Sequence, residues 1–192
     1  MEGASDRIAL VTLARRRDLE PPEVIVLGGA HAVGSYVRQA PHHAGLVGLC
    51  DAKEAPIFRR VLARVHVCDP DLEGELIRAL GVDRVQRIID SEGELASFRT
   101  LQRQPAQRAR PIEAQLGRFI GGRSGNKERY ARLFVEALDL DRVPAPLNLI
   151  FGRTSRCAPG SPPLGRAGAG AVDPAGEVEP GPVSHDETRG SD

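Results

Sequence analysis

The sequence predicts an α/β domain with a parallel sheet flanked by helices. Three short apolar runs, at residues 23–27, 45–50 and 65–68, alternate with segments of helical composition. The order strand, helix, strand is typical of βαβ units, whose strands are parallel. Beyond residue 71 the apolar residues recur at helical spacing, so the C-terminal portion is predicted to be mostly helical.

The strands and helices are expected at particular positions. Residues 23–27 form a continuous β-branched run stopped by Gly28-Gly29, which suits a buried parallel strand. Ser5 is a candidate N-cap for a first helix, whose apolar face contains Ile8, Val11 and either Leu10 or Ala14. Further helices are expected at residues 32–39, 56–64, 72–80, 82–92, 94–103, 112–120 and 126–140.

The chain is long enough for one domain with a core and too short for two domains of ordinary size. We assign this domain to residues 1–150. The segment 151–192 differs in composition, because the 41 residues from Gly152 onward include eight glycines and six prolines. Such a segment cannot bury enough apolar surface to offset the entropy of ordering, so a disordered tail is predicted.

The formal net charge is +0 at pH 7, so no overall field attracts nucleic acid or a membrane. Basic residues gather locally, because residues 99–132 include nine Arg/Lys and only two acids. This run fits a phosphate-binding surface, and it equally fits a set of solvated helix faces. The candidates for contacting nucleic acid are Arg99, Arg103, Arg123 and Arg129.

Cysteine usage and hydropathy bear on the compartment. Cys50, Cys68 and Cys157 lack CxxC spacing, and their odd number argues against a disulfide framework. Cys50 and Cys68 end apolar runs, where buried free thiols are common. The sequence has no signal peptide and no apolar run of about 18 residues, so we expect a cytoplasmic protein without membrane association.

Carboxylates follow the predicted strands. Asp51 comes directly after the run 45–50, and Glu73 and Glu75 follow the run 65–68. Open parallel sheets bind ligands at the carboxyl ends of their strands, and clustered carboxylates are the oxygen ligands that Mg²⁺ or Mn²⁺ requires. Each residue also has an ordinary explanation, since Asp caps helices and acids are favoured in a first helical turn. Their joint occurrence favours a metal site.

Lys127 is unusual in its local context. It follows Gly125-Asn126, where a helix is expected to begin, and a cation in a first helical turn is disfavoured. A bound anion would explain it, because helix N-termini attract phosphate, and a solvated surface lysine is the alternative. No histidine pair has zinc-ligand spacing and no glycine-rich loop matches a nucleotide-binding motif, so neither a zinc enzyme nor an ATPase is indicated.

Several motifs together resemble a TOPRIM domain, and more narrowly the nuclease half of the overcoming-lysogenization-defect (OLD) family of ATP-dependent endonucleases. The resemblance covers roughly residues 1–145 and rests on Glu2-Gly-Ala-Ser-Asp6, Gly28-Gly29, Leu49-Cys-Asp51, Asp71-Leu-Glu73 and Gly125-Asn-Lys127. It implies hydrolysis of DNA phosphodiester bonds with one or two Mg²⁺ or Mn²⁺ ions. Glu2 and Lys127 are the implied catalytic residues, and Lys127 would stabilise transition-state charge. The implied metal ligands are Asp6, Asp51, Glu54, Glu73 and Glu75.

The chain departs from that family's pattern in three ways. Lys53 stands at the second Asp of an Asp-x-Asp motif, so Glu54 must substitute or a second metal ion is weakened. The family's ATPase half is absent, so control by ATP would require a separate ATPase chain. Met1 stands where the first strand should end, which implies a missing or truncated strand and an apolar edge suited to homodimer formation.

Two hypotheses follow from these observations. The first is a metal-dependent DNA endonuclease of the TOPRIM type that lacks its own ATPase domain. The second is a catalytically weak or inactive TOPRIM module that binds nucleic acid or a partner ATPase. Lys53 and the missing strand favour the second, and the presence of Glu2, Asp51, Glu73 and Lys127 favours the first.

Overall fold

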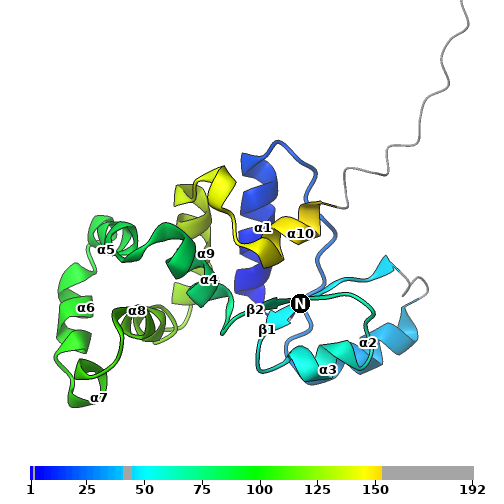
Figure 1. The fold of residues 1–192 in the computed structure, drawn as a ribbon, viewed down its shortest axis with the longest axis horizontal. Helices are drawn as coiled ribbons and strands as arrows, with labels where there is room; N and C mark the ends of the chain where they lie inside the picture. The colour runs from blue at the N-terminus through cyan, green and yellow to red at the C-terminus, as the bar shows by residue number, and fades with distance from the viewer. Residues whose placement is uncertain (2, 41–44, 153–192) are drawn as a thin grey trace, which may run out of the picture. The chain divides into compact units, whose positions relative to one another are not determined.

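The computed structural model describes residues 1, 3–40 and 45–152 (Figure 1). Two short strands, β1 (Gly48–Asp51) and β2 (Val65–Cys68), pair in parallel in the register Gly48↔Val65 to Asp51↔Cys68. Helix α3 (Ala55–Arg59) connects them, which confirms the predicted parallel βαβ unit. The molecule is a mixed α/β protein with a small sheet.

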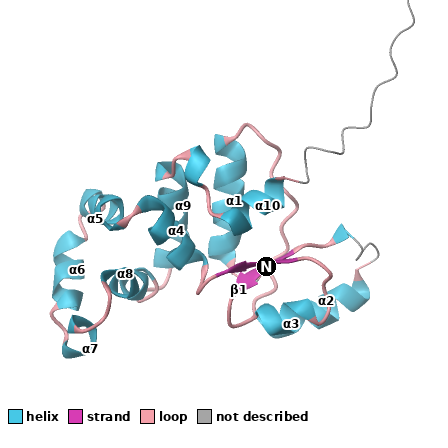
Figure 2. Ribbon diagram, viewed as in Figure 1, coloured by secondary structure: helices cyan, strands magenta, loops and turns pink. Residues whose placement is uncertain are grey.

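The other elements are helical (Figure 2), which confirms the helical C-terminal portion. Helices α7 and α10 were not predicted. In chain order the helical elements are α1 (Ala4–Arg16), the 3-10 helix η1 (Ala30–Ala32), α2 (Val33–Gln39), α4 (Leu72–Leu80), α5 (Val82–Ser91), α6 (Leu95–Gln102), α7 (Pro105–Arg108), α8 (Ile112–Ile120), α9 (Asn126–Ala137), the 3-10 helix η3 (Leu140–Arg142) and α10 (Ala145–Phe151).

The prediction of a strand at residues 23–27 is wrong, because the sheet within the described residues consists of β1 and β2 only. The segment pairs instead with a single residue. The Met1 amino group donates to Ile25 O and Leu27 N–H donates to Met1 O, both at 3.0 Å. A β-branched run becomes a strand only when a neighbour pairs along its length, which Met1 alone does not provide.

The two strands separate two apolar clusters. Leu49 and Cys68 belong to the main cluster, together with residues of α1, α4, α8, α9 and α10. Cys50 points to the opposite face, into a smaller cluster with Val33 and Phe58 beside α2 and α3. Figure 1 shows α2 and α3 on one side of the strands and α1 and α10 on the other. Helices therefore flank both faces, as predicted.

The expected details of α1 need correction. Its N-cap is Gly3, and Ser5 lies buried inside the first turn. Val11, predicted to face the core, is 41% exposed, and the buried face is formed by Ala9, Leu10, Leu13 and Ala14. Alternating small and long residues on this face let α1 pack closely along α9.

Side chains at the end of α1 fix its direction relative to α9. The Arg16 guanidinium donates to Val135 O at 2.7 Å and to Leu138 O at 2.6 Å, which satisfies carbonyls at the C-terminal end of α9. Arg15 pairs with Glu136 at 3.0 Å. Because the two helices meet at their C-terminal ends and pack along their lengths, their first turns lie at one end of the pair.

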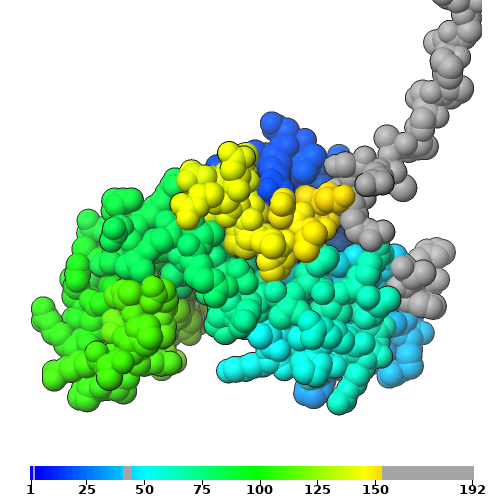
Figure 3. Space-filling model, viewed as in Figure 1, coloured from blue at the N-terminus to red at the C-terminus, as the bar shows by residue number. Residues whose placement is uncertain are grey.

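The C-terminal end of the described chain belongs to the core. Phe151 is buried in α10, which packs against β2, and Figure 3 shows the yellow-orange surface of α10 beside the cyan surface around residues 45–68. Cys50 and Cys68 are buried free thiols, as predicted. Cys157 and the predicted tail from residue 153 onward lie outside the described residues. None of the described helices has the length and apolar character needed to cross a membrane.

Candidate metal centre

Five elements bring acidic side chains and one lysine to a pocket of about 380 Å³ at the carboxyl end of β1. Asp6 comes from the first turn of α1, Asp51 ends β1, and Glu54 directly precedes α3. Glu73 and Lys127 lie in the first turns of α4 and α9. The structure thus groups five of the residues that the sequence nominated.

The start of α4 decides which of two neighbouring glutamates reaches the pocket. Asp71 is the N-cap of α4, and its Oδ1 accepts a hydrogen bond from Gly74 N–H at 2.8 Å. Glu73 is 5% exposed and lines the pocket. Glu75 does not line it, because Glu75 Oε1 accepts from Asp69 N–H at 3.1 Å and pairs with Arg78 at 2.9 Å. Glu73 and Glu75 are two positions apart on the helix and so point in different directions, and only Glu73 reaches the pocket.

Lys127 and Glu73 form the central ion pair of the pocket. Gly125, in the left-handed conformation with φ 78°, is the N-cap of α9, and it places Lys127 in the first turn. Lys127 Nζ lies 3.3 Å from both Glu73 Oε1 and Glu73 Oε2. Glu73 Oε1 is buried and accepts no hydrogen bond within the described residues. A second cation would therefore find a buried, incompletely satisfied carboxylate here.

The environment of the pocket favours the neutral form of its aspartates. Burial raises the pKa of Asp51 to about 7, and the charges of Asp6, Asp71 and Glu73 add to this effect. Burial likewise raises the pKa of Asp6 to about 6, although Asp6 Oδ2 accepts a hydrogen bond from Gly3 N–H at 3.2 Å, which acts in the opposite direction. In both cases the nearby positive charge is too small to offset burial and the charges of the neighbouring carboxylates.

Lys127 supplies only part of the positive charge that would balance these carboxylates. Burial acts to lower the pKa of the Lys127 ammonium, but the carboxylates of Glu73, Asp71 and Asp51 outweigh burial, so that this pKa is raised. The ammonium is thus held firmly protonated. Five lining residues carry a carboxyl group against this one ammonium: Asp6, Asp51, Glu54, Glu73 and Glu128.

The donor set fits a hard divalent cation. Carboxylate oxygens with raised pKa values and a buried oxygen without a hydrogen bond suit Mg²⁺ or Mn²⁺. In the present arrangement, no group of three or more His, Cys, Asp or Glu among the described residues is close enough to hold an ion. Glu2, the remaining catalytic candidate, lies outside the described residues.

Lys53 and Glu54 occupy different environments. Lys53 is exposed and does not line the pocket, whereas Glu54 does. Of these two neighbouring residues, only Glu54 contributes to the lining of the pocket.

The predicted nucleic-acid-binding arginines divide into two pairs. Arg99 lies in α6, Arg103 is the C-cap residue of this helix, and both are exposed. Arg123 pairs with Glu94 at 3.7 Å but remains 60% exposed. The Arg129 guanidinium is engaged in a network by Glu92, Glu94 and Asn126, so a contact of Arg129 with a DNA backbone would require breaking these bonds.

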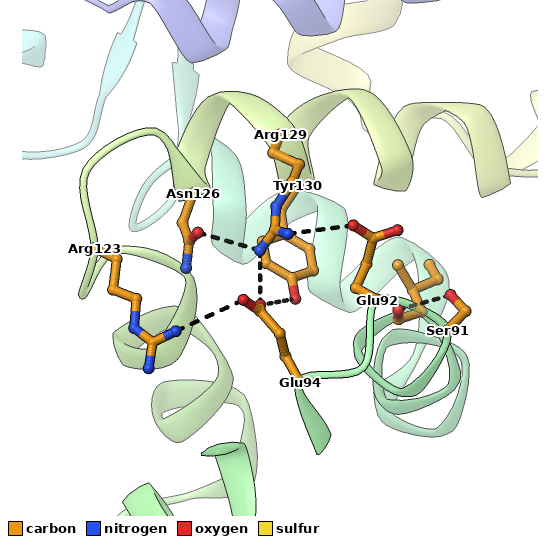
Figure 4. A network of polar contacts seen from close by, with 8 residues as sticks. Ser91, Glu92, Glu94, Arg123, Asn126, Arg129 and Tyr130 are labelled. Carbon is orange, nitrogen blue, oxygen red and sulfur yellow. Dashed lines mark hydrogen bonds and ion pairs between the residues drawn. The ribbon is translucent and has the colours of Figure 1, made fainter. Parts of the chain in front are cut away.

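Figure 4 shows this network at the start of α9. The Arg129 guanidinium donates to Glu94 Oε2 at 2.7 Å, to Glu92 Oε2 at 3.3 Å and to Asn126 Oδ1 at 3.2 Å. Tyr130 O–H donates to Glu94 Oε2 at 2.6 Å, and this bond together with Arg129 lowers the pKa of Glu94. The network fixes the first turn of α9 against the loop before α6, and Lys127 belongs to that turn.

Sequence reasoning missed some residues in and beside the pocket. Asp71 does not line it but contributes negative charge to Asp51 and Lys127, and its Asp-x-x-Gly capping pattern was the available signal. Ser5 and Glu128 do line the pocket. Ser5 belongs to the motif Glu2-Gly-Ala-Ser-Asp6 but was considered only as an N-cap, and nothing in the local sequence distinguishes Glu128 from an ordinary first-turn residue.

No protein-family model, curated protein or solved structure matches this chain. The chemistry of the pocket is therefore inferred from its own residues.

Proposed function

We propose that this protein is a metal-dependent DNA endonuclease of the TOPRIM type, acting in the cytoplasm. One observation supports this most. Asp6, Asp51, Glu54, Glu73 and Lys127, drawn from five elements, line a single pocket at the carboxyl end of a parallel strand. Ligands of open α/β sheets bind at that edge.

The residues have distinct roles in this proposal. Asp51 and Glu73 would hold Mg²⁺ or Mn²⁺, with Asp6 and Glu54 beside them. The ion would supply Lewis acidity toward the phosphodiester and would activate water. Asp6, whose pKa is about 6, is suited to accept a proton from the attacking water near neutral pH.

Lys127 would stabilise negative charge on the reacting phosphate. Its ammonium lies 3.3 Å from the carboxylate of Glu73. With Glu73 engaged in holding a divalent ion, the Lys127 ammonium would be available to stabilise the negative charge that develops on the phosphate oxygens. Such preorganised charge is commonly the largest contribution to catalysis.

A second candidate is a TOPRIM module that binds nucleic acid or a separate ATPase chain without cutting DNA. The ion pair between Lys127 and Glu73 favours it, because an internal ammonium already compensates the carboxylate that a metal would need. Exposed Arg99 and Arg103 would then contact backbone phosphate.

A cleavage assay distinguishes the two candidates. Supercoiled and linear DNA should be incubated with Mn²⁺ and wild-type protein, Asp51→Asn or Asp90→Asn. Asp90 is an exposed residue of α5 outside the pocket and provides the matched control. The nuclease proposal expects cleavage by wild type and Asp90→Asn only. Wild-type activity no greater than that of Asp51→Asn would refute it and leave the binding module.

A further inference from the structure

The helices beside the smaller apolar cluster carry an excess of positive charge. Residues 30–40 and 52–64, which contain η1, α2 and α3, include a single acid, Glu54, and Glu54 lines the acidic pocket. The whole chain has a formal net charge of +0, so the excess is a local property of this layer. The basic residues of the two segments are Arg38, Lys53, Arg59, Arg60 and Arg64.

The arginines at the ends of α2 and α3 have no carboxylate partner. Elsewhere in the described chain, ion pairs engage Arg15, Arg78, Arg84, Arg123 and Arg129. By contrast, Arg38, Arg59 and Arg60 form no ion pair or hydrogen bond within the described residues, and all three are exposed. Their guanidinium groups are therefore available to an external anion.

Packing between the two helices brings these arginines to one region. Helix α2 packs against α3 (Figure 1). A Cβ atom at Gly34 would stand 3.6 Å from Arg38 Nη1 and 3.9 Å from Val61 Cγ1. The Arg38 guanidinium thus lies at the boundary between the helices, beside Val61. Val61 is itself exposed, and it directly follows Arg59 and Arg60 in the chain.

Helix dipoles explain only part of this arrangement. Arg38 and Arg59 lie in the last turns of α2 and α3, where positive charge is favoured. Arg60 follows as the C-cap residue of α3 and adds a second positive charge next to the first. Neighbouring charges of the same sign repel each other, and an anion that contacts both removes this repulsion. The pair Arg59-Arg60 therefore favours an anionic partner.

We propose that Arg38, Arg59 and Arg60 form a surface that binds the phosphate backbone of duplex DNA. Guanidinium groups match phosphate oxygens in pairs, and several exposed guanidinium groups suit a polyanion with one charge about every 3.4 Å along each strand. The inference rests on the proposed function for the choice of DNA as the partner. It adds a DNA contact on α2 and α3, outside the basic run of residues 99–132.

The surface lies a short distance along α3 from the acidic pocket. Glu54 lines the pocket and directly precedes α3, whereas Arg59 ends this helix. Five helical residues rise by about 8 Å, which corresponds to roughly two base-pair steps of a duplex. A phosphate bound by Arg59 and Arg60 would therefore belong to the same DNA segment as a phosphodiester in the pocket.

The salt dependence of DNA binding tests this surface. In EDTA, Arg59→Gln/Arg60→Gln should reduce the slope of log affinity against log salt by about two units, and adding Arg38→Gln should reduce it by about one more. Arg87→Gln/Arg142→Gln removes the same charge from exposed residues of α5 and η3 and should leave the slope unchanged. Fluorescence anisotropy with a labelled duplex measures each slope. Equal slopes for wild type and Arg59→Gln/Arg60→Gln, or no binding of the duplex by wild type, would overturn the proposal.

A conservative variant separates lost charge from altered folding. Arg59→Lys/Arg60→Lys keeps both charges and should retain the wild-type slope. A slope as low as that of the Gln variant would count against the proposal. Failure of the proposed function gives a different result: equal cleavage by wild type and Asp51→Asn, with a slope that still depends on Arg59 and Arg60, would refute the endonuclease and support this surface.

Discussion

The two lysines of this chain, Lys53 and Lys127, are a matched pair for testing a charge in the pocket. Lys127 contacts both oxygens of buried Glu73, whereas Lys53 is exposed. If Lys127 acts on transition-state charge, Lys127→Met should lower turnover by roughly 10²–10³-fold while DNA affinity stays nearly constant. Lys53→Met should leave turnover close to wild type. Single-turnover kinetics at saturating enzyme separate the two effects, and weaker DNA binding with unchanged turnover would refute the catalytic role.

Asp51 provides a direct test of metal binding. It ends β1 and lies beside Asp6, Asp71 and Glu73, whose charges raise its pKa. Asp51→Asn should weaken Mn²⁺ binding at least tenfold in calorimetric titration, which corresponds to about 1.4 kcal/mol. Asp90→Asn is the control. Equal affinities in wild type and Asp51→Asn would exclude Asp51 as a ligand.

At the scale of elements, the network around Glu94 fixes the helix that carries Lys127. Glu94→Gln removes the negative charge of the carboxylate that Arg129, Tyr130 and Arg123 all contact. We expect the free energy of unfolding to fall by about 1–3 kcal/mol, because charge-assisted hydrogen bonds are lost. Glu113→Gln, at an exposed first-turn glutamate of α8, should change it little. Urea denaturation measures both, and equal losses would contradict a special role for the network.

The basic surface can be tested through its salt dependence. If Arg99 and Arg103 contact DNA phosphates, replacing both with Gln should reduce the slope of log affinity against log salt by about two units. Arg129→Gln should leave this slope unchanged, since its guanidinium is engaged by Glu92 and Glu94. Fluorescence anisotropy between about 50 and 200 mM salt provides the measurement. A slope that responds to Arg129 but not to Arg99 and Arg103 would reverse this assignment.

Elements with a strong apolar period could be predicted from the sequence, whereas the pairing of segments distant in the sequence could not. The patterns of β2 and α8 predicted their observed bounds, because apolar spacing and local sequence determine such elements. Short α7 and α10 have proline in the first turn and too few residues to show a period. Residues 23–27 have the composition of a strand, but pairing depends on a neighbour that the local sequence cannot reveal.

The residues of the site were likewise predictable from the sequence only in part. Carboxylates after strands correctly predicted that Asp51 and Glu73 would meet, because parallel strands end at one edge. The sequence did not separate Glu73 from Glu75, since both occupy the first turn of α4 and only packing decides which is buried. It also did not foresee that Arg129 is engaged by glutamates more than 30 positions away.

For the whole molecule, the raised aspartate pKa values predict how stability varies with pH. Asp6 and Asp51 have folded-state pKa values of about 6 and 7, above the ordinary value of 3.8. Between about pH 4 and pH 7 the folded state therefore binds more protons than the unfolded state, so stability falls as pH rises through this window. In EDTA, the free energy of unfolding should be lower at pH 8 than at pH 5.5.

Divalent ions should reverse that trend if they bind the same carboxylates. Millimolar Mg²⁺ should raise the free energy of unfolding more at pH 8, where Asp6 and Asp51 are ionised, than at pH 5.5. The double variant Asp6→Asn/Asp51→Asn should lose much of both dependences. Stability in EDTA that rises with pH across this window would contradict the buried-aspartate explanation.

The packing of α1 along α9 has a consequence for the order of folding. Arg15, Arg16 and Arg17 contact residues 119 to 131 positions later in the chain. Contacts of such long range form late, because the entropy of closing the intervening loop is lost before the contacts stabilise it. Asp6 and Lys127 begin these same two helices, so the acidic pocket is assembled only when they dock. If the pocket binds Mn²⁺ as proposed, Mn²⁺ uptake in a stopped-flow refolding experiment should follow the slowest phase, after most helical circular dichroism has returned.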